Sequence, residues 1–170
     1  MRSEPIDPPE ISWIRVAPQY VTVRLIGWSM SALISLAIFS IPLILLLTGV
    51  WPGFPAWLAW LLAGGTLVLQ LWIGLLIPRQ VRAIGYAERD EDLLIRQGIF
   101  FQRLMVVPYG RMQYVDVAVG PLERAFKLAS VKLHTASPQT NASIPGLPAE
   151  EAARLREQLS ARGQARLAGL

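Results

Sequence analysis

The fold of this chain is decided by the stretch LIGWSMSALISLAIFSIPLILLLTGVWPGFPAWLAWLLAGGTLVLQLWIGLLIP (residues 25–78), which contains no Asp, Glu, Lys, Arg or His. Its middle, TGVWPGFP at 48–55, holds two prolines and two glycines, which end helices. The break leaves two apolar segments, 25–47 and 56–77. Since about 20 apolar helical residues cross the roughly 30 Å hydrocarbon core of a bilayer, each segment is long enough to span it. The stretch predicts a transmembrane helical hairpin.

Arginines lie at both ends of this hairpin. Arg15 and Arg24 precede the first segment, and Arg79 and Arg82 follow the second, whereas the central turn carries no charge. Because Lys and Arg near the ends of a span favour the cytoplasmic side, we expect both termini to be cytoplasmic. The same four arginines are candidates for contact with anionic lipid, although topology alone would account for them. A cleaved signal peptide is not expected, because the apolar run is too long and starts too late.

The remaining sequence divides around the hairpin. Residues 1–24 form a proline-rich leader, expected to be irregular chain near the lipid headgroups. Residues 79–162 combine short runs of alternating hydrophobicity with an amphipathic helix expected at 148–162, and 163–170 form a tail. The pattern predicts an α+β membrane protein in which a small β-barrel or sandwich, capped by a C-terminal helix, follows the hairpin.

The strands of this domain can be placed from the alternation of their side chains. Runs rich in Val, Ile, Leu and aromatic residues are expected as strands at 81–88, 93–98, 100–108, 111–119, 130–136 and 142–144. A short helix is expected at 122–129. In the fourth run, the period of two places Val117 and Val119 in the core.

Several motifs after the hairpin are similar to those of a known family. They are IRQG at 95–98, P-x-x-R-x-Q-x-V-D at 108–116, GPLER at 120–124 and IPGL at 144–147. In this order, after two spans, they resemble membrane-anchored bacterial proteins of the YdbS type, which carry a pleckstrin-homology-like domain. The resemblance implies two nearly orthogonal antiparallel sheets capped by a C-terminal helix, in a protein of the bacterial inner membrane. It also implies, as partner, a larger membrane protein with several such domains or further copies of this chain.

Residues that could support catalysis are few. The chain has no cysteine and a single histidine, His134, which has no second histidine or cysteine to join it as a zinc ligand. The acidic turn at 88–92 lacks the spacing of a calcium-binding EF-hand, and no Gly-rich phosphate loop, GxSxG or HExxH motif is present. We therefore expect no enzymatic activity, metal or cofactor. Nucleic-acid binding is not expected either, because the arginines are spread along the domain without a basic helix.

The family-like motifs contain five candidate protein-interaction residues: Arg111, Gln113, Asp116, Arg124 and Lys127. In one interpretation they shape an edge to which a partner adds a strand. In the other they are structural, with Arg111 or Arg124 paired to Asp116 at the corner between strand and helix. The structural interpretation is favoured for these residues, because corner motifs often need such pairs.

The leading function predicted from the sequence is a scaffold or protein-interaction module held at the membrane. An alternative is a module that senses anionic lipid. Eukaryotic pleckstrin-homology domains often bind phosphoinositides at the first turn between strands, but here that turn (88–92) has four acidic residues, which would repel a phosphorylated headgroup. A weaker alternative is an accessory subunit of a membrane enzyme or exporter, contacted through Gln70 and Pro42.

Overall fold

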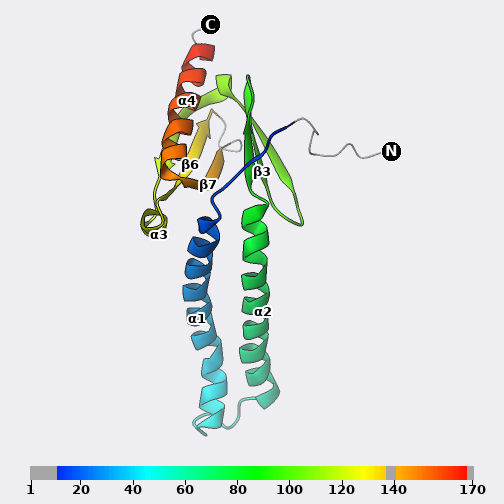
Figure 1. The fold of residues 1–170 in the computed structure, drawn as a ribbon. Coiled ribbons are helices and arrows are strands. Elements are labelled where there is room, and N and C mark those ends of the chain that lie inside the picture. The colour runs from blue at the N-terminus through cyan, green and yellow to red at the C-terminus, as the bar shows by residue number, and fades with distance from the viewer. Residues whose placement is uncertain (1–10, 137–140, 168–170) are drawn as a thin grey trace, which may run out of the picture. The chain divides into compact units, whose positions relative to one another are not determined.

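The computed structural model describes residues 11–136 and 141–167 of the chain (Figure 1). The chain forms two compact units: residues 21–78 make up the first, and the residues before and after them make up the second. The predicted fold class is confirmed, with two long apolar helices followed by antiparallel sheets and a C-terminal helix.

The helical hairpin consists of α1 (Gln19–Leu47) and α2 (Ala56–Arg82). Both helices are long and apolar enough to cross a membrane, and only 6% of the most apolar window of each is buried. Such exposure of apolar side chains suits a surface that contacts lipid. Both helices extend beyond the predicted apolar segments: α1 begins at Gln19 rather than residue 25, and α2 continues through Pro78 to Arg82 rather than ending at 77.

Gln70 links the two helices of the hairpin. Its side-chain oxygen accepts a hydrogen bond from Trp28 Nε1 at 3.1 Å, and its Nε2 donates to Ser35 Oγ at 2.8 Å. The Trp28 ring packs against Gly74, where a Cβ would lie only 2.8 Å from the ring. Gln70 thus forms the hydrogen bonds between helices that are expected of a lone amide within an apolar span. Because both ends of its amide are engaged within the hairpin, Gln70 no longer favours an accessory-subunit function.

The second unit contains two antiparallel sheets. Sheet A has the order β1 (Ile14–Arg15), β2 (Gly85–Glu88), β3 (Asp92–Gln97) and β4 (Arg103–Pro108). Sheet B has the order β5 (Met112–Ala118), β6 (Leu128–Thr135) and β7 (Ala142–Pro148). The 3-10 helix η1 (Tyr109–Arg111) joins β4 to β5, and the short helix α3 (Pro121–Ala125) joins β5 to β6.

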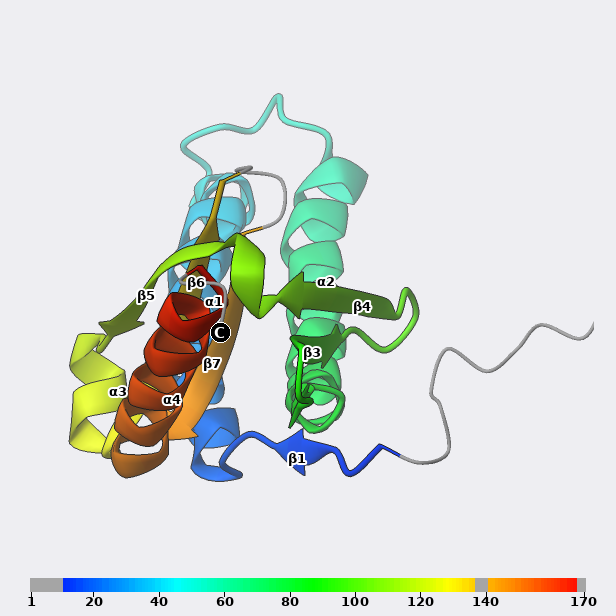
Figure 2. The same cartoon turned by 90° about the horizontal axis from the view of Figure 1, so that it is seen from above.

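The C-terminal helix α4 (Ala149–Leu167) covers sheet B and packs on η1 and on all three strands of the sheet (Figures 1 and 2). The apolar stripe of this amphipathic helix, formed by Ala152, Leu155 and Leu159, is completely buried. The prediction that Gly163 ends this helix is wrong, since α4 continues to Leu167. Burial of the Gly163 face explains the continuation, because packing overrides the low helix propensity of glycine.

The sequence predicted an irregular leader, but part of the leader forms a strand. Residues Ile14 and Arg15 form β1, which pairs with β2. Farther on, Ala17 N–H donates a hydrogen bond to the carbonyl of Gly146 at 2.9 Å. Gly146 has a φ of +69°, and a Cβ there would lie 2.3 Å from Tyr20 Cγ. Only glycine fits this position, which ties the segment before the hairpin to β7.

Several other predictions in the domain need correction. The strand expected at 100–108 begins only at Arg103, and the helix expected at 122–129 ends at Ala125, before β6 begins at Leu128. The strand expected at 81–88 is helical at its start, and only Gly85–Glu88 is extended. Val119 was expected in the core, but it follows the end of β5 and is 51% exposed. Each of these predictions fails where one element ends and the next begins, because an alternating pattern does not locate such ends.

Candidate interaction site

Strand β5 forms one edge of sheet B. It is hydrogen-bonded to β6 on one side, and the part of the chain that the structure describes provides no strand on its other side. In an antiparallel sheet, successive residues of an edge strand direct their backbone N–H and C=O groups alternately toward the neighbour and away from it. The outer side of β5 therefore carries backbone groups that can pair with an added strand.

A bulge lies near the start of β5. Met112 is opposite Thr135 and Tyr114 is opposite His134, so Gln113 has no partner on β6. As a result, Gln113 and Tyr114 are both exposed, whereas Met112 is buried. The sequence predicted an unbroken alternation here, but the extra residue moves Gln113 out of it. Bulges of this kind redirect side chains and occur often at sheet edges.

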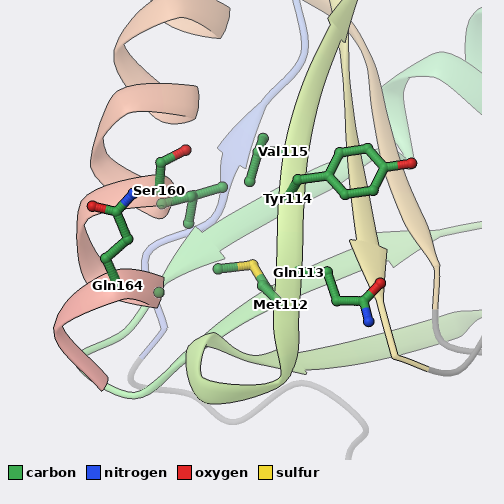
Figure 3. A pocket seen from close by; sticks show the side chains of 8 residues that line it. Met112, Gln113, Tyr114, Val115, Ser160 and Gln164 are labelled. Carbon is green, nitrogen blue, oxygen red and sulfur yellow. The ribbon is translucent and has the colours of Figure 1, made fainter. Parts of the chain in front are cut away.

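A hollow of about 180 Å³ is lined by residues of β5 and α4, and we call it the β5–α4 pocket. Its lining residues are Met112, Gln113, Tyr114, Val115, Leu159, Ser160, Gly163 and Gln164. Figure 3 shows Met112 and Val115 pointing toward α4, while the ring of Tyr114 points away from the helix. The missing side chain at Gly163 leaves room beside the methyl group of Met112, since a Cβ there would lie 3.9 Å from it. The pocket thus has an apolar floor, with the hydroxyl of Ser160 and the amide of Gln164 on the α4 side, while the amide of Gln113 points away from the helix (Figure 3).

Beside this pocket, Tyr114 stacks on His134. Their ring centroids are 4.3 Å apart and the ring planes differ by 11°. This stacking gives His134 a structural role on the outer face of β6. Among the residues that the structure describes, no group of three His, Cys, Asp or Glu side chains is placed to hold a metal ion.

The five predicted interaction residues do not form one cluster. Gln113 lines the β5–α4 pocket, whereas Arg124 and Lys127 line a separate hollow of about 440 Å³ near the start of α4. Arg111 in η1 and Asp116 in β5 are exposed and line neither hollow. Lys127 has a φ of +55°, and its carbonyl accepts a hydrogen bond from Ala149 N–H at 3.0 Å.

The predicted ion pair between Asp116 and Arg111 or Arg124 is absent from residues 11–136 and 141–167. Instead, Glu123 holds the corner between β5 and β6. Its carboxylate accepts hydrogen bonds from Gly120 N–H at 2.8 Å and from Ser130 Oγ at 2.7 Å. Glu123 is the acidic residue of the GPLER motif, so the motif does stabilise a corner, but through a different carboxylate.

Two contacts that the sequence did not reveal hold α4 to sheet A. In the first, Arg154 lies between Glu88 on β2 and Glu151 on its own helix, at 2.6 Å from each. Tyr86 donates a hydrogen bond to Glu151 at 2.6 Å. Hydrogen bonding from Arg154 lowers the pKa of Glu151, while burial and the bond to Glu151 raise the pKa of Tyr86.

The second contact joins α4 to the acidic turn, residues 88–92. Arg162 Nη1 donates to the carbonyl of Arg89 at 2.7 Å and to Tyr109 Oη at 3.0 Å. Tyr109 in turn donates to the same carbonyl at 2.9 Å, and burial raises the pKa of its hydroxyl. The guanidinium also lies over the Tyr109 ring, 5.2 Å from its centre. No sequence pattern identifies the contacts of Arg162 with Arg89 and Tyr109, because the members of each pair are more than 50 residues apart.

Three of the four arginines predicted to contact lipid belong to the domain unit. Arg15 lies on β1 opposite Gly85, and Arg79 and Arg82 lie in the last turn of α2. Arg24 lies in the helical hairpin. Arg15, Arg79, Arg82 and Arg24 are all exposed.

Two apolar helices followed by two antiparallel sheets and a C-terminal helix define a membrane-anchored, pleckstrin-homology-like domain protein. The sequence pattern described as Bacterial PH domain matches residues 22–163, so this chain belongs to the bacterial PH domain family. A curated relative, the UPF0699 transmembrane protein YdbS of Bacillus subtilis (strain 168), is 35% identical over 108 residues. That alignment covers 63% of this chain and 67% of the relative. No solved structure matches the chain. The predicted resemblance to YdbS-type proteins is confirmed.

Proposed function

We propose that this transmembrane protein is a non-enzymatic interaction module whose pleckstrin-homology-like domain binds another protein at the edge of β5. The observation that carries the proposal is the combination of an open strand edge with the β5–α4 pocket beside it. An extended segment of a partner would pair with the outer backbone groups of β5. One of its apolar side chains would enter the pocket against Met112 and Val115.

The partner we propose is a larger membrane protein that carries several domains of the same kind, or a second copy of this chain. The size of the pocket supports a short peptide segment, because about 180 Å³ accommodates one apolar side chain and little more. Exposed Arg111 and Gln113 near the start of β5 would then contact polar or acidic groups that flank this side chain.

The proposal is tested by photo-crosslinking of the full-length protein in its native membrane. A photoreactive amino acid at Tyr114 should give a discrete crosslink to one partner, whereas the same probe at Ala153, on the exposed side of α4, should not. The crosslink should weaken in Gly163→Leu, which fills the pocket, but persist in Ala161→Leu, its matched control on the exposed face of the same helix. Equal crosslinking at both probe sites, or a monomer throughout purification in mild detergent, would contradict the proposal.

The orientation we propose, in the inner membrane with both termini cytoplasmic, follows from the arginines at the ends of the hairpin. A reporter that is active only in the cytoplasm, fused after Leu170, should be active. A reporter that is active only after export should be silent at the same position. The reverse pattern would overturn this orientation.

A second function, recognition of anionic lipid, is favoured by the exposed Arg15 and Arg82, which flank the start of β2. Basic residues near an anionic surface each contribute about 1 kcal/mol of attraction. In liposomes, spin-labelled anionic lipid should be retained at the protein in preference to zwitterionic lipid, and salt should weaken the preference. Arg15→Gln with Arg82→Gln should remove most of it. Equal retention of the two lipids by the unaltered protein would exclude this function.

A further inference from the structure

The turn between β3 and β4, residues 98–102, lies at the same end of sheet A as the end of α2. Gly85, the first residue of β2, is opposite Arg96, and Gln97 at the end of β3 is opposite Arg103. The turn between β3 and β4 therefore lies at the end of sheet A at which β2 begins. Only two residues, 83 and 84, separate Arg82 of α2 from Gly85.

This turn, which we call the aromatic turn, has the sequence GIFFQ and exposes two phenylalanines. The side chain of Phe100 is 73% exposed and that of Phe101 is 93% exposed. The conformation is set by Gly98, whose φ is +99° and where a Cβ would lie 2.1 Å from the carbonyl oxygen of Phe101. Adjacent exposed aromatic residues, held in place by a required glycine, are characteristic of a contact surface rather than of a solvated loop.

Charge around the aromatic turn is basic. Arg103 begins β4 directly after the turn and is exposed, as are Arg82 and Arg15. Arg96 lies over the Trp13 ring at 4.8 Å from its centre. At its other end, β3 begins at Asp92 in the acidic turn, which has four acidic residues. Sheet A is thus basic and aromatic at the end reached from α2, and acidic at the other end.

We propose that the aromatic turn is a second membrane contact, in which Phe100 and Phe101 enter the interfacial layer of the bilayer that the hairpin spans. Chain connectivity argues for lipid as the occupant. The apolar run of α2 ends at Ile77, and from Arg82 to Gly85 the chain can extend by only about 10 Å. Aromatic side chains favour the membrane interface, and arginines beside them pair with lipid phosphates. The acidic turn at the far end would be repelled by an anionic surface, which favours the same orientation.

This inference does not depend on the protein-binding function proposed for β5, which uses the other sheet. It assigns the domain a fixed orientation on the membrane, with the aromatic turn as the contact that prevents rotation about the end of α2. If the domain contacts lipid through the aromatic turn of sheet A, the β5 edge of sheet B stays available to a protein.

The absence of cysteine from the chain allows a direct test with single labels. Phe101→Cys and Asp90→Cys, each carrying an environment-sensitive fluorophore, place the same label on the aromatic and the acidic turn of the full-length protein. In nanodiscs that hold one copy each, lipids with a quencher at the headgroup–acyl boundary should quench the Phe101 label several-fold more than the Asp90 label. Equal quenching of the two labels would overturn the proposal.

The same labels distinguish lipid from a protein occupant. If the Phe101 label stays exposed to water in single-copy nanodiscs and becomes shielded only with two copies per disc or on addition of membrane extract, the turn binds protein and the lipid assignment is wrong. Arg103→Gln should reduce the quenching in anionic discs and leave it unchanged in neutral ones. Unchanged quenching in both would overturn the contribution of this arginine.

Discussion

The two turns of sheet A lie at opposite ends of the same strand, β3, and differ in almost every property. The acidic turn is tied to α4: Arg154 binds Glu88, and both Arg162 and Tyr109 donate to the carbonyl of Arg89. The aromatic turn instead exposes Phe100 and Phe101 to the surroundings. The acidic turn thus makes stabilising contacts within the domain, while the aromatic turn exposes apolar side chains that do not pack in the core.

This difference bears on how the fold can recognise its ligands. The turn that often binds phosphoinositides in eukaryotic pleckstrin-homology domains is, in this chain, acidic and held by the C-terminal helix. A phosphorylated headgroup would meet four carboxylates there. Contact with lipid is therefore expected at the other end of the sheet, where arginines and aromatic side chains occur together.

The largest effect is expected from Gly98→Ala, which breaks the aromatic turn. A non-glycine residue in such a conformation costs about 1–3 kcal/mol, and the carbonyl of Phe101 must also move away from the new Cβ. We expect the domain to lose roughly 2–3 kcal/mol of its free energy of unfolding. Hydrogen exchange of the β3 and β4 amides in the full-length protein measures this loss.

Gly163→Ala is the matched control for that substitution. The new Cβ would meet its neighbours at ordinary distances, 3.7 Å from Tyr109 O and 3.9 Å from Met112 Cε. Because alanine favours a helix over glycine, α4 should gain about 0.5–1 kcal/mol of stability. If both substitutions destabilise the domain equally, the special conformation of Gly98 does not explain the first result.

Much of this architecture could be predicted from the sequence, because strong local patterns determine it. The uncharged stretch at 25–78 identifies the hairpin, and the stripe of Ala152, Leu155 and Leu159 identifies the face of α4 that is buried. Element ends were less predictable. Helix α2 runs past Pro78 into polar sequence, and Gly163 is helical because packing on sheet B compensates for its low propensity.

The candidate site was less predictable than the fold. Gln113 could be selected from a motif, but its exposure depends on a one-residue bulge that only the register with β6 reveals. The stacking of Tyr114 on His134 had a usable signal, because both residues fall on the outward positions of two consecutive strands. Contacts between residues distant in sequence, such as Arg154 with Glu88, produce no periodic pattern in the sequence from which they could be predicted.

A smaller effect is expected from Arg154→Met, which removes one of the two contacts between α4 and the acidic turn while keeping an apolar stem. The side chain of Arg154 is 45% exposed, so its ion pairs are weakened by solvent and contribute about 1 kcal/mol together. The control is Arg156→Met on the same helix, whose contact with Glu157 is 3.6 Å long and more exposed. Its effect should stay within about 0.5 kcal/mol, and hydrogen exchange of the domain compares the two.

The contact also predicts how stability depends on pH. Glu151 accepts hydrogen bonds from Arg154 and Tyr86, and its folded pKa is lowered, chiefly by the hydrogen bond from Arg154. Its stabilising contribution is therefore present above the unfolded pKa of about 4.5 and is lost as the pH falls through the lower folded value. Arg154→Met should show a smaller loss of stability between pH 7 and acid than the unaltered protein. Parallel curves for the two proteins would contradict this assignment.

The smallest effect on stability is expected from the double substitution Phe100→Ser and Phe101→Ser. Both side chains are exposed, so the free energy of unfolding of the domain in detergent should change by no more than about 0.5 kcal/mol. Leu94→Ser on the adjoining strand is the contrasting control, because Leu94 is only 2% exposed and its loss from the core should cost several times more. In lipid nanodiscs, by contrast, the double variant should lose the protection from hydrogen exchange that the bilayer gives to residues 98–102. A stable variant with unchanged protection would show that the phenylalanines of this turn do not make its contact with the membrane. The two ends of sheet A would then differ, as regards lipid contact, in their charge alone.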